Sequence, residues 1–196
     1  QQPQQQQQQP QWLAIVFSGT DDVRTSIADG DIYLKPFGPL DNNGHSIFMP
    51  GTNARVHAGF DNSVFHNHLD LYPQIKRLLA HHLKAGTTLY TTGHSLGAAN
   101  ALLLAAALLL DTSINSTISH VRSISFGCPR IGNHHFTDNV NALSERLHIW
   151  RFVLGWDLVP RLPEYPFQHA GHTLQMIKGN ANLTRAYYQH RGNASL

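Results

Sequence analysis

Residues 87–110 begin Thr87-Thr88-Leu89-Tyr90-Thr91-Thr92-Gly93-His94-Ser95-Leu96-Gly97 and continue as an almost unbroken run of alanine and leucine to Leu110. The threonine-rich start is typical of a β-strand, and residues 96–110 are apolar on nearly every side, which predicts a buried helix. The Gly93–Gly97 segment between them is a G-x-S-x-G pattern. A serine on such a tight turn is pushed out above the sheet edge, and the glycines permit the strained backbone. The pattern predicts Ser95 as a nucleophile; the alternative is a helix start at which Ser95 caps free amides.

Four further segments are predicted to be strands, because each is a short apolar run closed by a turn signal. They are a buried strand at 12–17 and strands at 121–126, 147–154 and 172–177. Apolar residues at helical spacing predict helices at 60–85 and 136–144, and Pro73 either splits the first or lies in the first turn of a new helix. Strands that alternate with helices favour an α/β fold. Residues 20–58 are expected to be irregular, apart from one helical turn near 23–28.

Length and composition exclude several classes of protein. The chain has 196 residues, 41% of them apolar, which suits one compact domain with a sizeable core. Its 14 Lys and Arg against 12 Asp and Glu leave a net charge of +2, too small for a nucleic-acid-binding surface. The single cysteine, Cys128, excludes an internal disulfide framework and a cysteine zinc site, and we expect it to be a small buried residue. The sequence contains no run of about 18 apolar residues, which is the length that a transmembrane helix needs.

The first eleven residues differ from the rest. Residues 1–11 are glutamine broken only by Pro3 and Pro10, a low-complexity composition expected to be disordered, so the folded domain is expected at 12–196. Because the chain opens on Gln1, we expect it to be a piece of a longer protein. Three glycosylation sequons, beginning at Asn115, Asn182 and Asn193, hint at a secretory route.

A nucleophilic serine needs a base and a carboxylate that orients the base. In hydrolases with this turn the chain order is serine, acid, histidine. Of the acids after Ser95, only Asp157 directly follows a strong strand, so it is predicted to be the triad acid. The alternative is a loop acid that caps the following turn.

Five blocks of sequence occur in the order of a known family, and together they cover about residues 12–178. They are Ser18-Gly19-Thr20, Val56-His57-Ala58-Gly59-Phe60, Gly93-His94-Ser95-Leu96-Gly97, Phe126-Gly127-Cys128-Pro129-Arg130-Ile131-Gly132-Asn133 and Asp157-Leu158-Val159-Pro160-Arg161-Leu162-Pro163. In these blocks the chain resembles the class 3, or fungal-type, lipases.

The resemblance implies an α/β-hydrolase core sheet flanked by helices, of which this chain lacks recognisable parts at both ends. It implies a serine ester hydrolase acting on acylglycerols or related lipid esters, with Ser95 as nucleophile and Asp157 as triad acid. It also places Thr20 and the Leu96 backbone N–H at the oxyanion position. No metal or organic cofactor is implied, and the partners are a lipid or small ester and a lipid surface. Residues 23–29 resemble the lid but lack the tryptophan often found there, which leaves soluble esters and phospholipids open as substrates.

Three histidines follow Asp157 and are candidates for the base: His169, His172 and His190. His169 lies in a segment that resembles a part of the family without the triad histidine, and His172 opens a predicted strand. His190 is the best candidate within the chain, but its surroundings do not resemble the catalytic loop, so we expect the base beyond Leu196. The side chain of His94 is expected to point away from the site.

Two alternatives to this interpretation stay open. Adjacent histidines such as His81-His82 and His134-His135 invite a metal site, but on a helix their side chains point about 100° apart and rarely share an ion. The rival to an enzyme is a hydrolase-fold binding or scaffold protein that has lost catalysis. A fluorophosphonate probe, which reports an activated serine, distinguishes the two.

Overall fold

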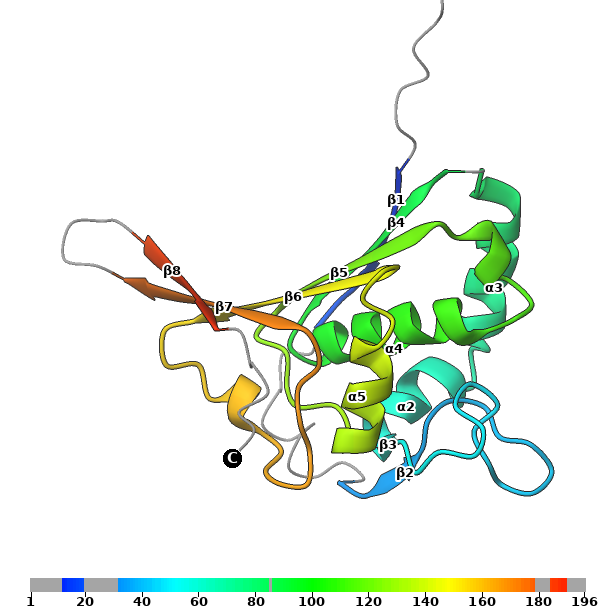
Figure 1. Cartoon of the computed structure of the whole chain (residues 1–196), viewed down its shortest axis with the longest axis horizontal. Helices are drawn as coiled ribbons and strands as arrows, with labels where there is room; N and C mark the ends of the chain where they lie inside the picture. The colour runs from blue at the N-terminus through cyan, green and yellow to red at the C-terminus, as the bar shows by residue number, and fades with distance from the viewer. Residues whose placement is uncertain (1–11, 20–31, 85, 179–183, 190–196) are drawn as a thin grey trace, which may run out of the picture.

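The computed structural model describes residues 12–19, 32–84 and 86–178, and the backbone of 184–189. Its main feature is a six-stranded sheet in the order β1-β4-β5-β6-β7-β8. The first five strands in this order run parallel to one another, and β8 runs antiparallel to β7 (Figure 1). The strands are β1 (Trp12–Phe17), β4 (Thr88–His94), β5 (His120–Phe126), β6 (Leu147–Leu154), β7 (His172–Lys178) and β8 (Thr184–Gln189). Residues 1–11 and the turn expected near 23–28 lie outside the described residues.

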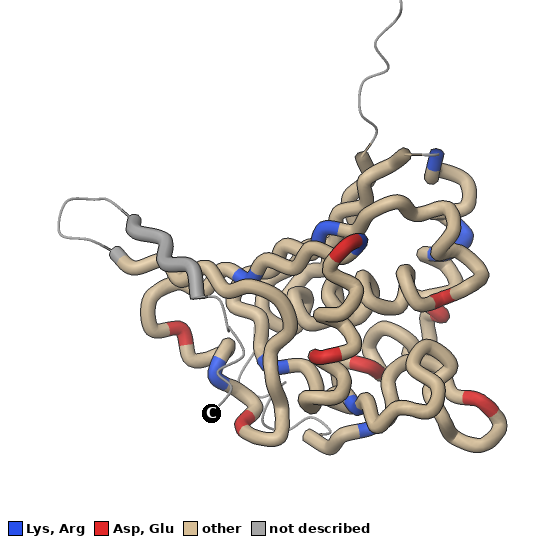
Figure 2. The backbone as a smooth tube through the Cα atoms, viewed as in Figure 1, with Lys and Arg blue, Asp and Glu red and all other residues tan. Residues whose placement is uncertain are grey.

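Helix α4 (Leu96–Leu110) is the centre of the core. It packs along the sheet against β1, β4, β5 and β6, and every residue between Leu96 and Leu110 is buried. Its alanines let the helix approach the strands closely, and no charged residue interrupts it (Figure 2). Helices α2 (Ala58–Phe65) and α5 (His134–Asn141) lie on the same face of the sheet (Figure 1).

The helix predicted at 60–85 is wrong as a single element. The chain forms α2 and then α3 (Leu71–His82), and Pro73 lies in the first turn of α3, where its missing N–H costs nothing. The alternative of a new helix at Pro73 is thereby confirmed. Helix α5 begins two residues before the predicted start because the Asn133 side chain caps it, accepting a hydrogen bond from the Phe136 N–H at 3.0 Å.

Residues 32–57 are better ordered than we predicted. Two three-residue strands, β2 (Leu34–Pro36) and β3 (Arg55–His57), pair antiparallel, and Phe37 and Phe48 pack in the core with ring centroids 5.5 Å apart. The fully buried Asp61 holds this segment onto α2: it accepts a hydrogen bond from the Gly38 N–H at 2.7 Å and pairs with the Lys35 ammonium at 2.7 Å. Such short strands leave little periodicity, which is why the sequence did not reveal them.

Strand β1 has the predicted bounds, but the prediction that it is buried is wrong. Its side chains alternate, and Trp12 and Val16 are 66% and 70% exposed. The reason is that β1 is the edge strand of the described sheet and only its inner residues meet α4. Strand β8 was not predicted at all.

Asp111 links the end of α4 to α3. It receives hydrogen bonds from the Lys76 ammonium and the Tyr72 hydroxyl, each at 2.8 Å, and from the Ser113 hydroxyl and N–H. Partial burial alone would raise the pKa of Asp111, but the bonds from Lys76, Ser113 and Tyr72 outweigh it and lower that pKa to about 2. Burial and the Asp111 carboxylate raise the pKa of Tyr72.

The Lys76–Asp111 pair should make stability depend on pH. Because the folded-state pKa of Asp111 is depressed, the pair's contribution is fully present above about pH 4 and is lost as the pH falls towards 2. Lys76→Met should therefore lower the free energy of unfolding by about 1 kcal/mol at pH 7, a value reduced for solvent exposure, and by less at pH 3. Urea titrations at both pH values measure this, with exposed Lys84→Met as control. An equal loss at pH 7 and pH 3 would contradict the assignment.

Candidate active site

Ser95 lies on a strained turn between β4 and α4. Its backbone angles are φ 55° and ψ −121°, a region that residues with a side chain rarely adopt. The turn is fixed by a hydrogen bond from the Ser95 N–H to the Phe126 carbonyl at 2.9 Å. The Ser95 side chain makes no capping bond to α4, so the capping alternative is wrong. Its Oγ is buried and has no hydrogen-bond partner among the described residues.

The glycines that flank Ser95 are required by close backbone contacts. A Cβ on Gly93 would lie 2.3 Å from the Gly97 carbonyl oxygen, and a Cβ on Gly97 would lie 2.5 Å from the Ser18 carbonyl oxygen. These contacts bring the end of β1, the end of β4 and the start of α4 together. The G-x-S-x-G spacing thus serves both the strained turn and the packing around it.

Gly97→Ala should therefore destabilise the protein. The neighbours of the new methyl group would be backbone atoms, which cannot move aside locally, so we expect a loss of about 2–3 kcal/mol in the free energy of unfolding. The matched control is Gly59→Ala, also in the first turn of a helix, where the nearest atom to the new Cβ is the His57 ring at 3.2 Å. Denaturant titration of both variants tests the argument, and equal losses would contradict it.

Asp157 follows β6 at the same edge of the sheet as Ser95. Its Oδ1 accepts a hydrogen bond from the Val159 N–H at 3.0 Å, and its Oδ2 lies 2.9 Å from where a Cβ on Gly127 would stand. Gly127 follows β5 with φ +57°, and its N–H donates to the Phe152 carbonyl at 2.9 Å. The carboxyl ends of β4, β5 and β6 therefore gather Ser95, Gly127 and Asp157. Gly127 was not predicted as a site residue; the turn directly after β5 is the signal that could have found it.

His94 lies closer to the site than we expected. Its Nδ1 is 3.4 Å from the Cβ position of Gly19, and its Nε2 is 3.5 Å from the Cβ position of Gly127, which Asp157 also approaches. The exposed ring thus lies across the ends of β1, β4 and β5 instead of pointing away from them. Glycines at 19 and 127 leave room for it.

Of the two predicted oxyanion donors, Leu96 lies among the described residues. Leu96 is the first residue of α4, so its N–H belongs to the amides that a helix start leaves free. Thr20 lies outside the described residues. The two residues before it reach the site, because Ser18 contacts Gly97 and Gly19 contacts His94.

The histidines after Asp157 differ in position. His169 hydrogen-bonds through Nε2 to the Pro160 carbonyl at 2.7 Å, so in a neutral ring that nitrogen carries the proton. His172 begins β7 and pairs with Trp150 of β6, in register with Thr92 of β4, so it lies three strands to the side of the strand that leads to Ser95. His190 lies outside the described residues.

No group of His, Cys, Asp and Glu in the described parts of the chain could hold a metal ion. Cys128 is buried as predicted, and burial raises the pKa of its thiol to about 12, although the nearby Arg151 opposes the shift. A thiol with that pKa is protonated at neutral pH and is a poor nucleophile. Ser95 is therefore the candidate nucleophile of the site.

A parallel sheet with helices packed on it, and a serine on a strained strand-to-helix turn, define the chain as an α/β-hydrolase, as the sequence predicted. The chain matches the family model of Lipase (class 3) over residues 14–167 and belongs to that family. No helix of the described residues is long and apolar enough to cross a membrane.

Individual relatives agree with the family. Over 108 residues the chain is 38% identical to phospholipase A1-IIbeta of Arabidopsis thaliana, covering 53% of this chain and 26% of that protein. Over 178 residues it is 29% identical to the secreted mono- and diacylglycerol lipase MDL3 of Malassezia globosa, covering 89% and 55%. Lipase II from Rhizopus niveus superposes with a TM-score of 0.67 at 28% identity, covering 87% and 59% of the two chains. The chain thus spans less than two thirds of the length of these relatives.

Proposed function

We propose that the protein is a serine ester hydrolase acting on acylglycerols or related lipid esters. The observation that carries the proposal is Ser95: a buried hydroxyl on a strained turn, at the sheet edge that also holds Asp157. Membership of the class 3 lipase family supports the reaction type. The substrates named for the relatives, phospholipids and mono- and diacylglycerols, support a glycerol-based lipid ester.

In the proposed reaction Ser95 Oγ attacks the acyl carbonyl while a histidine takes its proton. Thr20 and the Leu96 N–H donate to the oxygen that becomes negatively charged, and Asp157 holds the histidine in the required tautomer. The alcohol leaves with the proton from the histidine, and the acyl group stays on Ser95. Water, deprotonated by the same histidine, then releases the carboxylic acid and restores the serine.

The base of this reaction is proposed to be His190 or a histidine beyond Leu196. Two features of the described residues support this. His172 lies on β7, three strands away from β4, and His169 already bonds the Pro160 carbonyl. A base must approach the nucleophile within about 3 Å, and neither ring is bonded to Ser95 Oγ.

Contact with a lipid surface and a secretory route are part of the proposal. Large apolar side chains around Asp157 are open to solvent: Trp156 is 81% exposed, Leu158 57% and Tyr165 87%. Aromatic side chains of this kind suit the boundary between water and lipid. The sequons and the name of the secreted relative from Malassezia globosa favour secretion.

Labelling with a fluorophosphonate tests the function without knowledge of the substrate. The experiment compares residues 1–196 with the complete gene product, each with and without His190→Ala. We expect rapid labelling of Ser95 in the complete product and slow labelling in residues 1–196. Full reactivity of residues 1–196 that His190→Ala abolishes would make His190 the base. Failure of the complete product to react would instead favour the binding or scaffold protein.

A further inference from the structure

The loop that follows Asp157 is held by a hydrogen bond from His169. The Nε2 of the half-buried His169 ring donates to the Pro160 carbonyl at 2.7 Å. Pro160 is buried in the short 3₁₀ turn η2 (Val159–Arg161), which begins two residues after Asp157. Because proline has no N–H, its carbonyl is the only backbone group through which a hydrogen bond can hold it.

The bond from His169 reaches Asp157 through this turn. Val159, the first residue of η2, donates its N–H to Asp157 Oδ1 at 3.0 Å, so the position of the turn sets the position of the carboxylate. His169, Pro160 and Asp157 also border a common cavity of about 240 Å³. The ring is therefore joined to the candidate triad acid by two hydrogen bonds and one turn of helix.

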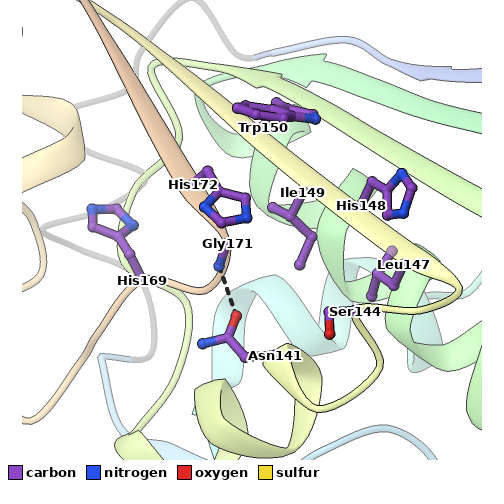
Figure 3. A pocket seen from close by; sticks show the side chains of 9 residues that line it. All are labelled: Asn141, Ser144, Leu147, His148, Ile149, Trp150, His169, Gly171 and His172. Atoms are coloured by element: carbon purple, nitrogen blue, oxygen red, sulfur yellow. Dashed lines mark hydrogen bonds between the residues drawn. The ribbon is translucent and has the colours of Figure 1, made fainter. Parts of the chain in front are cut away.

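The backbone on both sides of His169 is anchored to the rest of the domain. Before it, the Gln168 N–H donates to the Gly132 carbonyl at 2.6 Å. After it, the Gly171 N–H donates to Asn141 Oδ1 on α5 at 2.8 Å. Figure 3 shows this second bond, with the His169 ring on the side of the segment away from Asn141. Because the segment is held at both ends, the ring gives the loop a fixed support.

We propose that His169 is a positioning residue of the hydrolase, which holds Asp157 where its carboxylate can orient the catalytic histidine. The inference rests on the proposed function, and His169 acts through Pro160 and not on the substrate. The far end of the loop is held separately, because the Arg130 N–H donates to the Leu162 carbonyl at 2.7 Å. Loss of the His169 bond should therefore let Asp157 shift without releasing the whole loop. A misplacement of about 1 Å can cost about 10²-fold in rate.

Two substitutions at His169 in the complete gene product separate positioning from catalysis. His169→Leu removes the donor, so kcat for a p-nitrophenyl ester should fall about 10- to 100-fold while KM changes by less than about twofold. His169→Gln keeps an amide N–H at a similar reach to Nε2 but cannot act as a base, so kcat should stay within about fivefold of wild type. The rate at which a fluorophosphonate labels Ser95 should follow kcat in both variants.

His66→Leu is the matched control. The His66 ring, directly after α2, also bonds a backbone carbonyl, with its Nε2 3.4 Å from the Gly38 oxygen. The carboxylate beside this ring belongs to Asp61 and not to Asp157. The variant should lower the melting temperature, because it removes a bond of the same kind, and leave kcat within about twofold of wild type.

Three results would overturn the inference: wild-type kcat in His169→Leu, a change in KM alone, and a His169→Gln variant no faster than His169→Leu. If His169→Gln is as inactive as Ser95→Ala, His169 is the base instead. If the wild-type complete product is not labelled at Ser95, the proposed function fails and the positioning role fails with it. Normal labelling of the wild type and of His169→Leu alike refutes the positioning role alone.

Discussion

Replacing Ser95 with alanine is expected to lower kcat for a p-nitrophenyl ester by about 10⁶-fold in the complete gene product, the scale seen when a triad nucleophile is removed. Stability should change by less than about 0.5 kcal/mol, because Ser95 Oγ has no hydrogen-bond partner in the described residues, so its loss leaves none unsatisfied. Alanine meets the same strain at φ 55° as serine does. Initial rates and denaturant titrations measure the two effects.

Ser123 on β5 offers a matched control for this variant. Like Ser95 it is fully buried, and its Oγ has no hydrogen-bond partner in the part of the chain described. Ser123→Ala should keep full activity. If pure Ser95→Ala protein still hydrolyses the ester, Ser95 is not the nucleophile, whatever the activity of Ser123→Ala.

The elements that the sequence predicted to the residue are those with long apolar runs and clear boundaries. Helix α4 (Leu96–Leu110) and strand β6 (Leu147–Leu154) have the predicted bounds, since Ser95 and Gly155 close their runs. Strands β2, β3 and β8 escaped prediction because they are short or weakly apolar and form only against a partner. The sequence also did not predict that β1 is exposed, because the burial of a strand depends on which elements cover it and not only on its composition.

Some residues of the candidate site could be predicted from the sequence, and others could not. Ser95 and Asp157 could be identified from local signals, a turn motif and an acid after a strand. The turn after β5 marks Gly127 in the sequence, but the contacts of Gly127 and His94 join residues from separate strands, so the sequence does not show what these two residues approach. Thr20 and His190 stay predictions.

Asp157→Asn is expected to keep the fold and lose most of the activity. Asparagine can retain its Oδ1 and still accept the Val159 N–H, which is bonded at 3.0 Å in the wild type, so the turn should survive. The amide NH₂ would then replace Oδ2, the oxygen that remains to accept a proton from the base. A donor there favours the wrong tautomer of the histidine, which costs about 10⁴-fold in kcat in serine proteases.

The test compares kcat, and the free energy of unfolding, with those of Asp138→Asn and Glu164→Gln, which change exposed acids that also follow Ser95. Those two variants should stay within about twofold of wild-type activity, because Asp157 and His94, and not these two acids, are the side chains nearest the Cβ position of Gly127 after β5. If Asp157→Asn is near wild type while one of the other two abolishes activity, the acid is wrongly assigned. Loss of activity without loss of stability at Asp157 alone would tie the carboxylate to the reaction and not to the fold.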